Sequence, residues 1–314
     1  MTKLTAEFSV LIPAYKAART ISATLDAVAA QTITPLEILI YEDGCFDNLA
    51  QVVTNFAETA PCPVRLMSCP LNGGVSRARN ILLREARGEF IAFLDADDIW
   101  APDHLATTAA AFANGADVAF SGVTFIDAAG KPFGGRAEPS AEQLANIAPS
   151  LFRYNFVQAT STLSLRRSWI DRVGDFDVTL SHGEDLDLWL RLLAAGARWS
   201  YTGHCSCAYR KHATSAMGQT LLVVERMAAF YEKHLNNPLI PRAQRRRALI
   251  SNRRAQARLH WRRRPAGAVV ALRRLVRLQP WNPVYLLALP GVTVWSWFSD
   301  SSSAQTPTSA PRAT

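Results

Sequence analysis

The residues most suited to chemistry in this chain are three aspartates within four positions, Asp95, Asp97 and Asp98. They directly follow the apolar stretch from Phe90 to Leu94, which has the composition of a buried strand. Carboxylates this close repel one another unless a cation neutralises them, and their oxygens are the ligands that Mg²⁺ and Mn²⁺ prefer. The alternative is that these acids cap the following helix, but capping would explain only one of the three. We therefore expect a divalent metal site at this strand end.

Polar residues also follow the three earlier apolar runs of the chain. They lie at residues 13–16, 42–44 and 72–80, and each run precedes a segment with helical periodicity. In an open parallel sheet, the loops that follow the strands gather at one edge, where ligands bind. We expect carboxylates, glycines and one arginine to meet there. Arg77 and Arg79 compete for that place, because side chains two positions apart on a helix point in different directions.

The order of the elements predicts the fold class. Four strand–helix units are followed by a less regular region, which predicts an α/β fold with a mostly parallel central sheet and helices on both faces. We expect strands at 8–12, 36–41, 64–67, 90–94, 118–126 and 159–165, helices at 17–30, 49–56, 75–84, 103–112, 140–152 and 185–194, and a glycine-rich turn at 127–135.

Composition indicates a globular protein with a basic appendage. The 314 residues are 49% hydrophobic and 19% charged, which excludes wholesale disorder and collagen-like structure. The net charge of +8 is local, because residues 242–277 hold 13 arginines and no acid, whereas residues 1–241 hold 20 basic and 25 acidic residues. The basic net charge therefore comes from this one segment and does not indicate which ligands the main domain binds.

The cysteines favour a reducing, cytoplasmic setting. The chain has five of them, an odd number, and its start shows no positively charged region followed by an apolar run. Cys205 and Cys207 lack a second ligand pair at zinc spacing, so we expect both thiols simply to lie on a strand.

The arginine-rich region predicts two helices, at 242–264 and 266–278, and the second is amphipathic and cationic. The aromatic stretch 281–298 is interrupted by prolines and is too short to span a membrane. One interpretation is a contact with an anionic membrane surface, which would place the protein peripherally on the inner face of the plasma membrane. The alternative is a helical appendage packed on the catalytic domain or on a second subunit. We expect residues 299–314 to be disordered.

Seven short motifs, in order along the chain, resemble the family 2 glycosyltransferases. These are inverting enzymes with a GT-A fold that use nucleotide-diphosphate sugars, and similar bacterial enzymes build exopolysaccharides or cell-surface glycans. Each motif alone is weak, and the order makes the match strong over residues 8 to about 215. The motifs are Pro13-Ala14-Tyr15, Glu42-Asp43-Gly44, Asn72-Gly73 with Ala78-Arg79-Asn80, Asp95-Ala96-Asp97-Asp98, Gly174-Asp175-Phe176-Asp177, Glu184-Asp185 and Tyr209-Arg210-Lys211-His212.

The resemblance implies how the nucleoside is held. Pro13, Tyr15, Glu42 and Asp43 would bind it, with a carboxylate accepting a hydrogen bond from the base and Tyr15 packing on it. Asp95 would lie near the ribose. The family usually has two aspartates followed by Gly-Ser, where this chain has a glutamate, an aspartate, glycine and cysteine. The choice of UDP over GDP or TDP therefore stays open, with a UDP-sugar preferred.

The resemblance also implies which residues bind the metal and the diphosphate and which residue accepts the proton of the acceptor. Asp97 would ligate Mg²⁺ or Mn²⁺, and Arg79 would contact the diphosphate. Asp185 would be the general base, with Glu184 binding the acceptor or positioning the helix. His212 would be a further metal ligand or a phosphate contact.

These inferences combine into one expected function. A hexose would pass, with inversion, from a nucleotide-diphosphate sugar to a hydroxyl of a glycan or polyprenyl-linked acceptor. We expect a catalytic domain over 1–220, with its nucleotide side at 8–125 and its acceptor side at 126–220, then a helical appendage over 221–298.

Two other functions compete with this one. A sugar-nucleotide pyrophosphorylase would need a glycine-rich loop where the chain has Ala14-Tyr15-Lys16-Ala17. Nucleic-acid binding through the arginine segment is disfavoured, because that segment has no RNA-binding signature.

Overall fold

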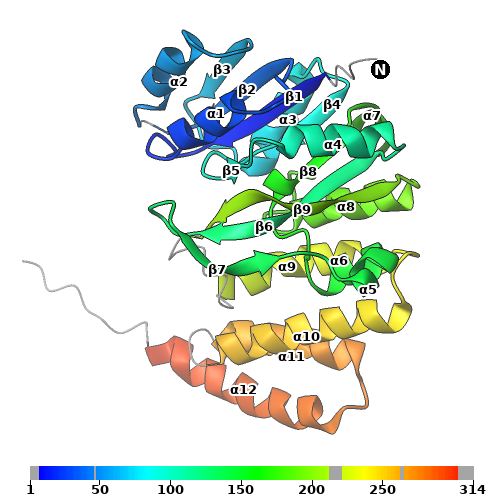
Figure 1. Ribbon diagram of the computed structural model, residues 1–314. Helices are drawn as coiled ribbons and strands as arrows, with labels where there is room; N and C mark the ends of the chain where they lie inside the picture. The colour runs from blue at the N-terminus through cyan, green and yellow to red at the C-terminus, as the bar shows by residue number, and fades with distance from the viewer. Residues whose placement is uncertain (1–6, 46, 212–220, 262–264, 303–314) are drawn as a thin grey trace, which may run out of the picture. The chain divides into compact units, whose positions relative to one another are not determined.

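The computed structural model describes residues 7–45, 47–211, 221–261 and 265–302 (Figure 1). The chain divides into two compact units, Met1–Ala216 and Met217–Thr314. In the described residues, unit 1 contains a nine-stranded sheet with its helices, and unit 2 consists of helices α9 to α12.

The strand–helix alternation predicted for the first 113 residues is present in unit 1. Each expected strand and helix of that region appears within a few residues of its predicted bounds. The strands of the unit are β1 (Phe8–Ala14), β2 (Glu37–Asp43), β3 (Val64–Cys69), β4 (Phe90–Phe93), β5 (Ile99–Trp100), β6 (Val118–Ile126), β7 (Pro132–Ala137), β8 (Leu163–Arg166) and β9 (Trp199–Arg210). The helices are α1 (Ile21–Ala29), α2 (Leu49–Ala57), α3 (Val75–Glu85), α4 (His104–Ala113), α5 (Ala141–Ala145), α6 (Ile147–Arg153), α7 (Ser168–Val173) and α8 (Glu184–Ala194).

The sheet has a parallel half and a mixed half. Its strand order is β3-β2-β1-β4-β8-β6-β9-β5, with β7 paired to β6. The four strands β3, β2, β1 and β4 are parallel, as the strand–helix units predict. Strand β8 pairs antiparallel with both β4 and β6, whereas β9 is parallel to β6. The carboxyl ends of β1, β2 and β4 therefore open at one edge.

Alternation along the strands gives each face of the sheet its own core. On one face, Phe8, Val10 and Ile12 belong to a cluster with apolar residues of α1, α2 and α4. On the other, the Phe93 ring packs edge-on against Phe176 and lies 6.2 Å from the Trp189 ring of α8. The sheet is thus sandwiched between helices, which leaves its edge of loops available for a site.

The second half of unit 1 agrees with the predicted elements at β6 and α8 and departs from them elsewhere. The glycine-rich region 127–135 is only partly a turn, because β7 begins at Pro132 and pairs with β6. The helix expected at 140–152 divides at Asn146 into α5 and α6. Strand β5 and helix α7 were not predicted, because two and six residues are too few to show a period.

Unit 2 contains α9 (Leu221–Lys233), α10 (Arg242–His260), α11 (Pro265–Leu278) and α12 (Pro283–Ser302). Ala268, Val269, Leu272 and Leu275 of α11 form its core with apolar residues of α10 and α12. Helix α12 continues through Pro290, although prolines interrupt the apolar stretch 281–298. It extends to Ser302, so the expected disorder from residue 299 is contradicted as far as residue 302, and 303–314 lie outside the described residues. No helix in the described part of the chain is long and apolar enough to cross a membrane.

Gly44 permits a close approach of two loops beside the predicted site. Its φ is +67°, and a Cβ at this position would lie 2.2 Å from the backbone nitrogen of Asn72. We expect Gly44→Ala to lower the free energy of unfolding by roughly 2–5 kcal/mol, because left-handed strain and backbone overlap add.

Gly196 offers a matched control, because its φ is +88° and nothing lies within 4 Å of a Cβ there. Gly196→Ala should cost only the left-handed strain, about 1–2 kcal/mol. Urea unfolding of both variants measures the difference between their free energies of unfolding. Equal losses of stability would show that the close approach at Gly44 does not contribute to the cost of the substitution.

Candidate active site

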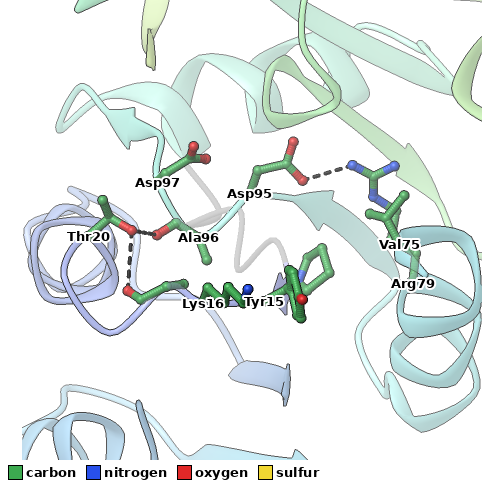
Figure 2. A pocket seen from close by; sticks show the side chains of 10 residues that line it. Tyr15, Lys16, Thr20, Val75, Arg79, Asp95, Ala96 and Asp97 are labelled. Atoms are coloured by element: carbon green, nitrogen blue, oxygen red, sulfur yellow. Dashed lines mark hydrogen bonds and ion pairs between the residues drawn. The ribbon is translucent and has the colours of Figure 1, made fainter. Parts of the chain in front are cut away.

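A cavity opens at the carboxyl ends of β1 and β4 (Figure 2). Its volume is about 430 Å³. Five residues singled out in the sequence lie in its wall. The lining residues are Pro13, Tyr15, Lys16, Ala17, Thr20, Val75, Arg79, Asp95, Ala96 and Asp97.

The backbone of the acidic loop is fixed by three side chains from distant parts of the chain. Ser161 Oγ accepts a hydrogen bond from the Asp95 amide at 2.9 Å. Arg210 Nε donates to the Asp97 carbonyl at 2.7 Å. Thr20 Oγ1 donates to the Ala96 carbonyl at 2.9 Å (Figure 2). With the backbone held in this way, the half-buried Asp95 and Asp97 side chains stay in the cavity wall.

Asp98 has a different position from its two neighbours. Its side chain is fully buried, and its carboxylate accepts hydrogen bonds from Ser161 Oγ at 2.5 Å and from the Arg210 amide at 2.9 Å. Burial, together with Asp95 and Asp97, raises the pKa of Asp98 well above its ordinary value. Asp98 therefore anchors the loop, and the case for a cation rests on the two acids that line the cavity.

Arg79 connects the cavity wall to helix α8. Its guanidinium, 4% exposed, pairs with Asp95 at 2.8 Å and with Glu184 at 3.4 Å. Burial alone would lower the pKa of Arg79, but the two carboxylates outweigh it and raise the pKa. A charged guanidinium is thus held between the acidic loop and the start of α8. Arg77, the competing candidate, does not line the cavity.

The start of α8 carries the predicted acid pair. Asp185 Oδ1 accepts a hydrogen bond from the Leu186 amide at 2.7 Å, and Oδ2 accepts one from Asn155 Nδ2 at 3.3 Å. Burial and then the charge of Glu184 raise the pKa of Asp185 to about 6. A carboxylate with this pKa accepts a proton more readily than an exposed aspartate and is still ionised near neutrality.

The pair Glu42 and Asp43 lies outside the cavity wall. Both are buried, and the Asp43 carboxylate accepts hydrogen bonds from the Gly73 and Gly74 amides, each at 2.8 Å. Asp43 thus holds the loop that leads into α3. His212, the other predicted metal ligand, lies outside the described residues.

The motifs that contain Asn80 and Phe176 are connected by hydrogen bonds that stabilise the fold. Asn80 and Phe176 exchange two hydrogen bonds, of 2.8 and 2.9 Å, between the Asn80 amide group and the Phe176 backbone. Arg191, paired with the buried Asp187, donates to the carbonyls of residues 173–175. Together these bonds fix α8 against α3, and so place Glu184 beside Arg79.

Sequence reasoning missed four residues with a clear part in this geometry. Lys16 lies in the cavity wall with φ +53°, and Thr20, Ser161 and Arg210 hold the acidic loop. Arg210 falls inside a motif that was recognised without a role for this side chain. Ser161 shows no local signal, because its partners are 63 and 66 residues away.

Comparison with known proteins agrees with this geometry. The family model described as "Glycosyl transferase family 2" matches residues 9–174, which is more than half of the chain. The chain therefore belongs to glycosyl transferase family 2, which confirms the resemblance inferred from its motifs.

Two relatives match over much of their length. An Escherichia coli enzyme, the UDP-Glc:alpha-D-GlcNAc-diphosphoundecaprenol beta-1,3-glucosyltransferase WfgD, is 28% identical over 59% of this chain and 69% of its own. A second Escherichia coli enzyme, the UDP-Glc:alpha-D-GlcNAc-diphosphoundecaprenol beta-1,3-glucosyltransferase WfaP, is 29% identical over 66% of this chain and 78% of its own. Six further curated relatives match over 90 to 99 residues. In these matches the chain spans only 10% to 38% of the relative's own length. One of them, an uncharacterised glycosyltransferase of Nostoc, is 40% identical, and the chain spans 30% of its length.

Solved structures share the fold. Staphylococcus aureus TarS 1–349 in complex with UDP-GlcNAc gives a TM-score of 0.61 at 20% identity, covering 87% of this chain and 81% of that one. The mannosyltransferase PcManGT of Pyrobaculum calidifontis, in complex with GDP-Man and Mn²⁺, gives 0.56 at 18% identity and covers 92% and 83%. The predicted GT-A type α/β fold is thereby confirmed.

Proposed function

We propose that the chain is an inverting hexosyltransferase that moves a sugar from a nucleotide-diphosphate donor to a hydroxyl of a glycan or lipid-linked acceptor. The observation that carries this proposal is the cavity in which Tyr15, Arg79, Asp95 and Asp97 meet at the strand ends. The names of WfgD and of the TarS complex, which include UDP-Glc and UDP-GlcNAc, support a UDP-sugar as donor.

The donor set fits a divalent metal. Asp95 and Asp97 present two half-buried carboxylates at the cavity, on a backbone fixed by hydrogen bonds. Mg²⁺ and Mn²⁺ are bound by one or two carboxylates together with substrate phosphates. Asp97, whose side chain lies in the cavity wall, would be the ligand, and Asp95 pairs with Arg79. When bound, the ion would neutralise charge that develops on the leaving diphosphate.

The chain's own residues would carry the remaining steps. Tyr15, half exposed at the cavity, would pack on the nucleoside beside Pro13. Glu42 and Asp43 would bind the base, and Asp43 also fixes the loop that leads into α3. Lys16 supplies a cation in the cavity wall. Asp185 would remove the acceptor proton while the hydroxyl oxygen attacks the anomeric carbon from the face opposite the departing diphosphate.

A donor screen tests the proposed function. Each UDP-, GDP- and TDP-sugar is added to the full chain with Mn²⁺, and thermal stabilisation and slow donor hydrolysis are measured. We expect UDP-sugars to raise the melting temperature only in the presence of the metal. Absence of stabilisation by every nucleotide-sugar would contradict the proposed function.

We further propose that unit 2 makes a peripheral contact with an anionic membrane. Arg273, Arg274 and Arg277 are exposed on α11, and Trp281, which follows, is 91% exposed. Leu287 on α12 is 79% exposed. Cations near an anionic surface together with exposed aromatic and aliphatic side chains are the features of a monotopic contact. The lipid-linked acceptor would then be met at the membrane.

Vesicle sedimentation tests this contact. We expect the triple variant Arg273→Gln, Arg274→Gln, Arg277→Gln to bind phosphatidylglycerol-containing vesicles about a hundredfold more weakly, since each cation contributes about 1 kcal/mol. The matched control removes three exposed arginines of unit 1, Arg87, Arg153 and Arg167. Equal weakening by both triple variants, or binding to pure phosphatidylcholine, would contradict a specific site on α11.

A further inference from the structure

A short loop beside the acid pair has features that its packing does not explain. Residues 154–158 connect α6 to the short 3₁₀ segment at 160–162. Tyr154 exposes 63% of its surface, although large aromatic side chains are usually buried. Gln158 has a φ of +63°, a strained value for a residue with a side chain. Strain of this kind persists where surrounding structure enforces it, and it clusters at ligand sites.

The strained backbone at Gln158 orients the exposed ring. Gln158 Nε2 donates to the Tyr154 hydroxyl at 3.4 Å and to the Asn155 carbonyl at 3.2 Å. The ring is thus held at its hydroxyl end while 63% of the residue stays exposed. A fixed aromatic ring gives a large contact area at a small cost in conformational entropy.

Asn155 connects the same loop to the acid pair. Its Nδ2 donates to Asp185 Oδ2 at 3.3 Å, and its buried Oδ1 has no hydrogen-bond partner among the described residues. If the amide were turned, Oδ1 would face Asp185, and two acceptors would oppose each other as long as Asp185 is ionised. The observed orientation therefore stabilises the ionised form of Asp185, at the expense of one unsatisfied oxygen.

We propose that residues 154–158 form the subsite for the acceptor sugar, a pyranose ring that packs on Tyr154 with its hydroxyl directed to Asp185. Asn155 is a positioning residue that keeps the Asp185 carboxylate ionised and oriented. The proposal rests on the proposed function, in which Asp185 is the general base. The proton of the attacking hydroxyl goes to Asp185, the new glycosidic bond forms, and the bond from the anomeric carbon to the diphosphate breaks.

Saturation-transfer NMR with simple pyranosides tests the subsite without turnover. The probes are the methyl glycosides of glucose, galactose, mannose and N-acetylglucosamine, added to the full chain with UDP and Mn²⁺. We expect at least one of them to bind, and Tyr154→Ala to weaken that binding about tenfold through loss of the buried ring contact. Tyr154→Phe keeps the ring and should bind nearly as well as the wild type.

Phe133→Ala is the matched control, because Phe133 is an exposed aromatic, 47% accessible, on β7 of the same unit. It should leave pyranoside binding unchanged. Binding of no pyranoside by the wild type, or equal binding by Tyr154→Ala and wild type, would overturn the subsite. Failure of UDP to bind would instead count against the proposed function, since UDP binding is measured separately.

The pH profile of transfer to the bound pyranoside tests Asn155. Because the Asn155 bond favours the ionised carboxylate, Asn155→Ala should raise the pKa of Asp185 and move the acidic limb of kcat to higher pH. The KM of the donor should stay the same. A lower kcat with an unmoved acidic limb would show that Asn155 is only structural, and would overturn its positioning role.

Discussion

Replacing Asp185 by asparagine is expected to lower the rate of sugar transfer by about 10²- to 10⁴-fold, the contribution that a positioned general base makes. Asparagine has nearly the same shape but cannot accept the proton of the attacking hydroxyl. Asp185 does not line the donor cavity, so the affinity for the nucleotide should stay close to that of the wild type. Steady-state kinetics and nucleotide calorimetry on the same variant separate the two effects.

The pH dependence gives a second measure of the same role. Burial and Glu184 raise the pKa of Asp185 to about 6, and only the ionised form can accept a proton. The wild-type kcat should therefore fall as the pH drops below about 6, and Asp185→Asn should lack this limb. Glu184→Gln is the control, because it alters the adjacent acid that pairs with Arg79. Near-normal turnover of Asp185→Asn, with a large loss in Glu184→Gln, would move the base to Glu184.

Asp97→Asn is expected to abolish the part of donor binding that depends on Mn²⁺. Asp97 would be the carboxylate that ligates the ion, and a neutral amide is a much poorer ligand for a hard cation. Titration calorimetry of UDP with and without Mn²⁺ should show metal-enhanced affinity in the wild type. In the variant, the two titrations should coincide.

Asp98 provides a matched control one position along the chain. It is fully buried between Ser161 and Arg210 and outside the cavity wall, so Asp98→Asn should keep the metal-enhanced affinity. Its effect should be on stability, since it changes the buried anchor of the acidic loop. Unchanged Mn²⁺ dependence in Asp97→Asn would exclude Asp97 as the ligand.

The parallel half of the sheet was predictable because its strands are continuous apolar runs, each followed by an amphipathic helix. In the mixed half, β6 was predicted as a strand, but the pairing was not, because pairing partners there are chosen by long-range packing. Strand β9 pairs with β6 across some eighty residues of chain, and β5 has only two residues. Neither feature leaves a periodic pattern in the local sequence.

The candidate site was predictable as a set of residue types at strand ends, but the hydrogen-bond partners were not. Nothing local to Asp98 distinguishes it from Asp97, and the difference comes from Ser161 and Arg210, which are distant in the chain. Likewise, the carboxylate of Asp43 is engaged by amides 30 and 31 positions further on. Such partners are set by the tertiary fold, so sequence reasoning identifies the acids without assigning which of them faces the ligand.

In the proposed function, the cavity at the ends of β1 and β4 binds a nucleotide diphosphate with a divalent ion. A crystal structure of the full chain with UDP and Mn²⁺ tests it most directly. We predict the uracil beside Tyr15, the diphosphate in the cavity, and the ion in contact with the Asp97 carboxylate. Density for UDP at another surface, or an ion that does not contact Asp97, would contradict the account.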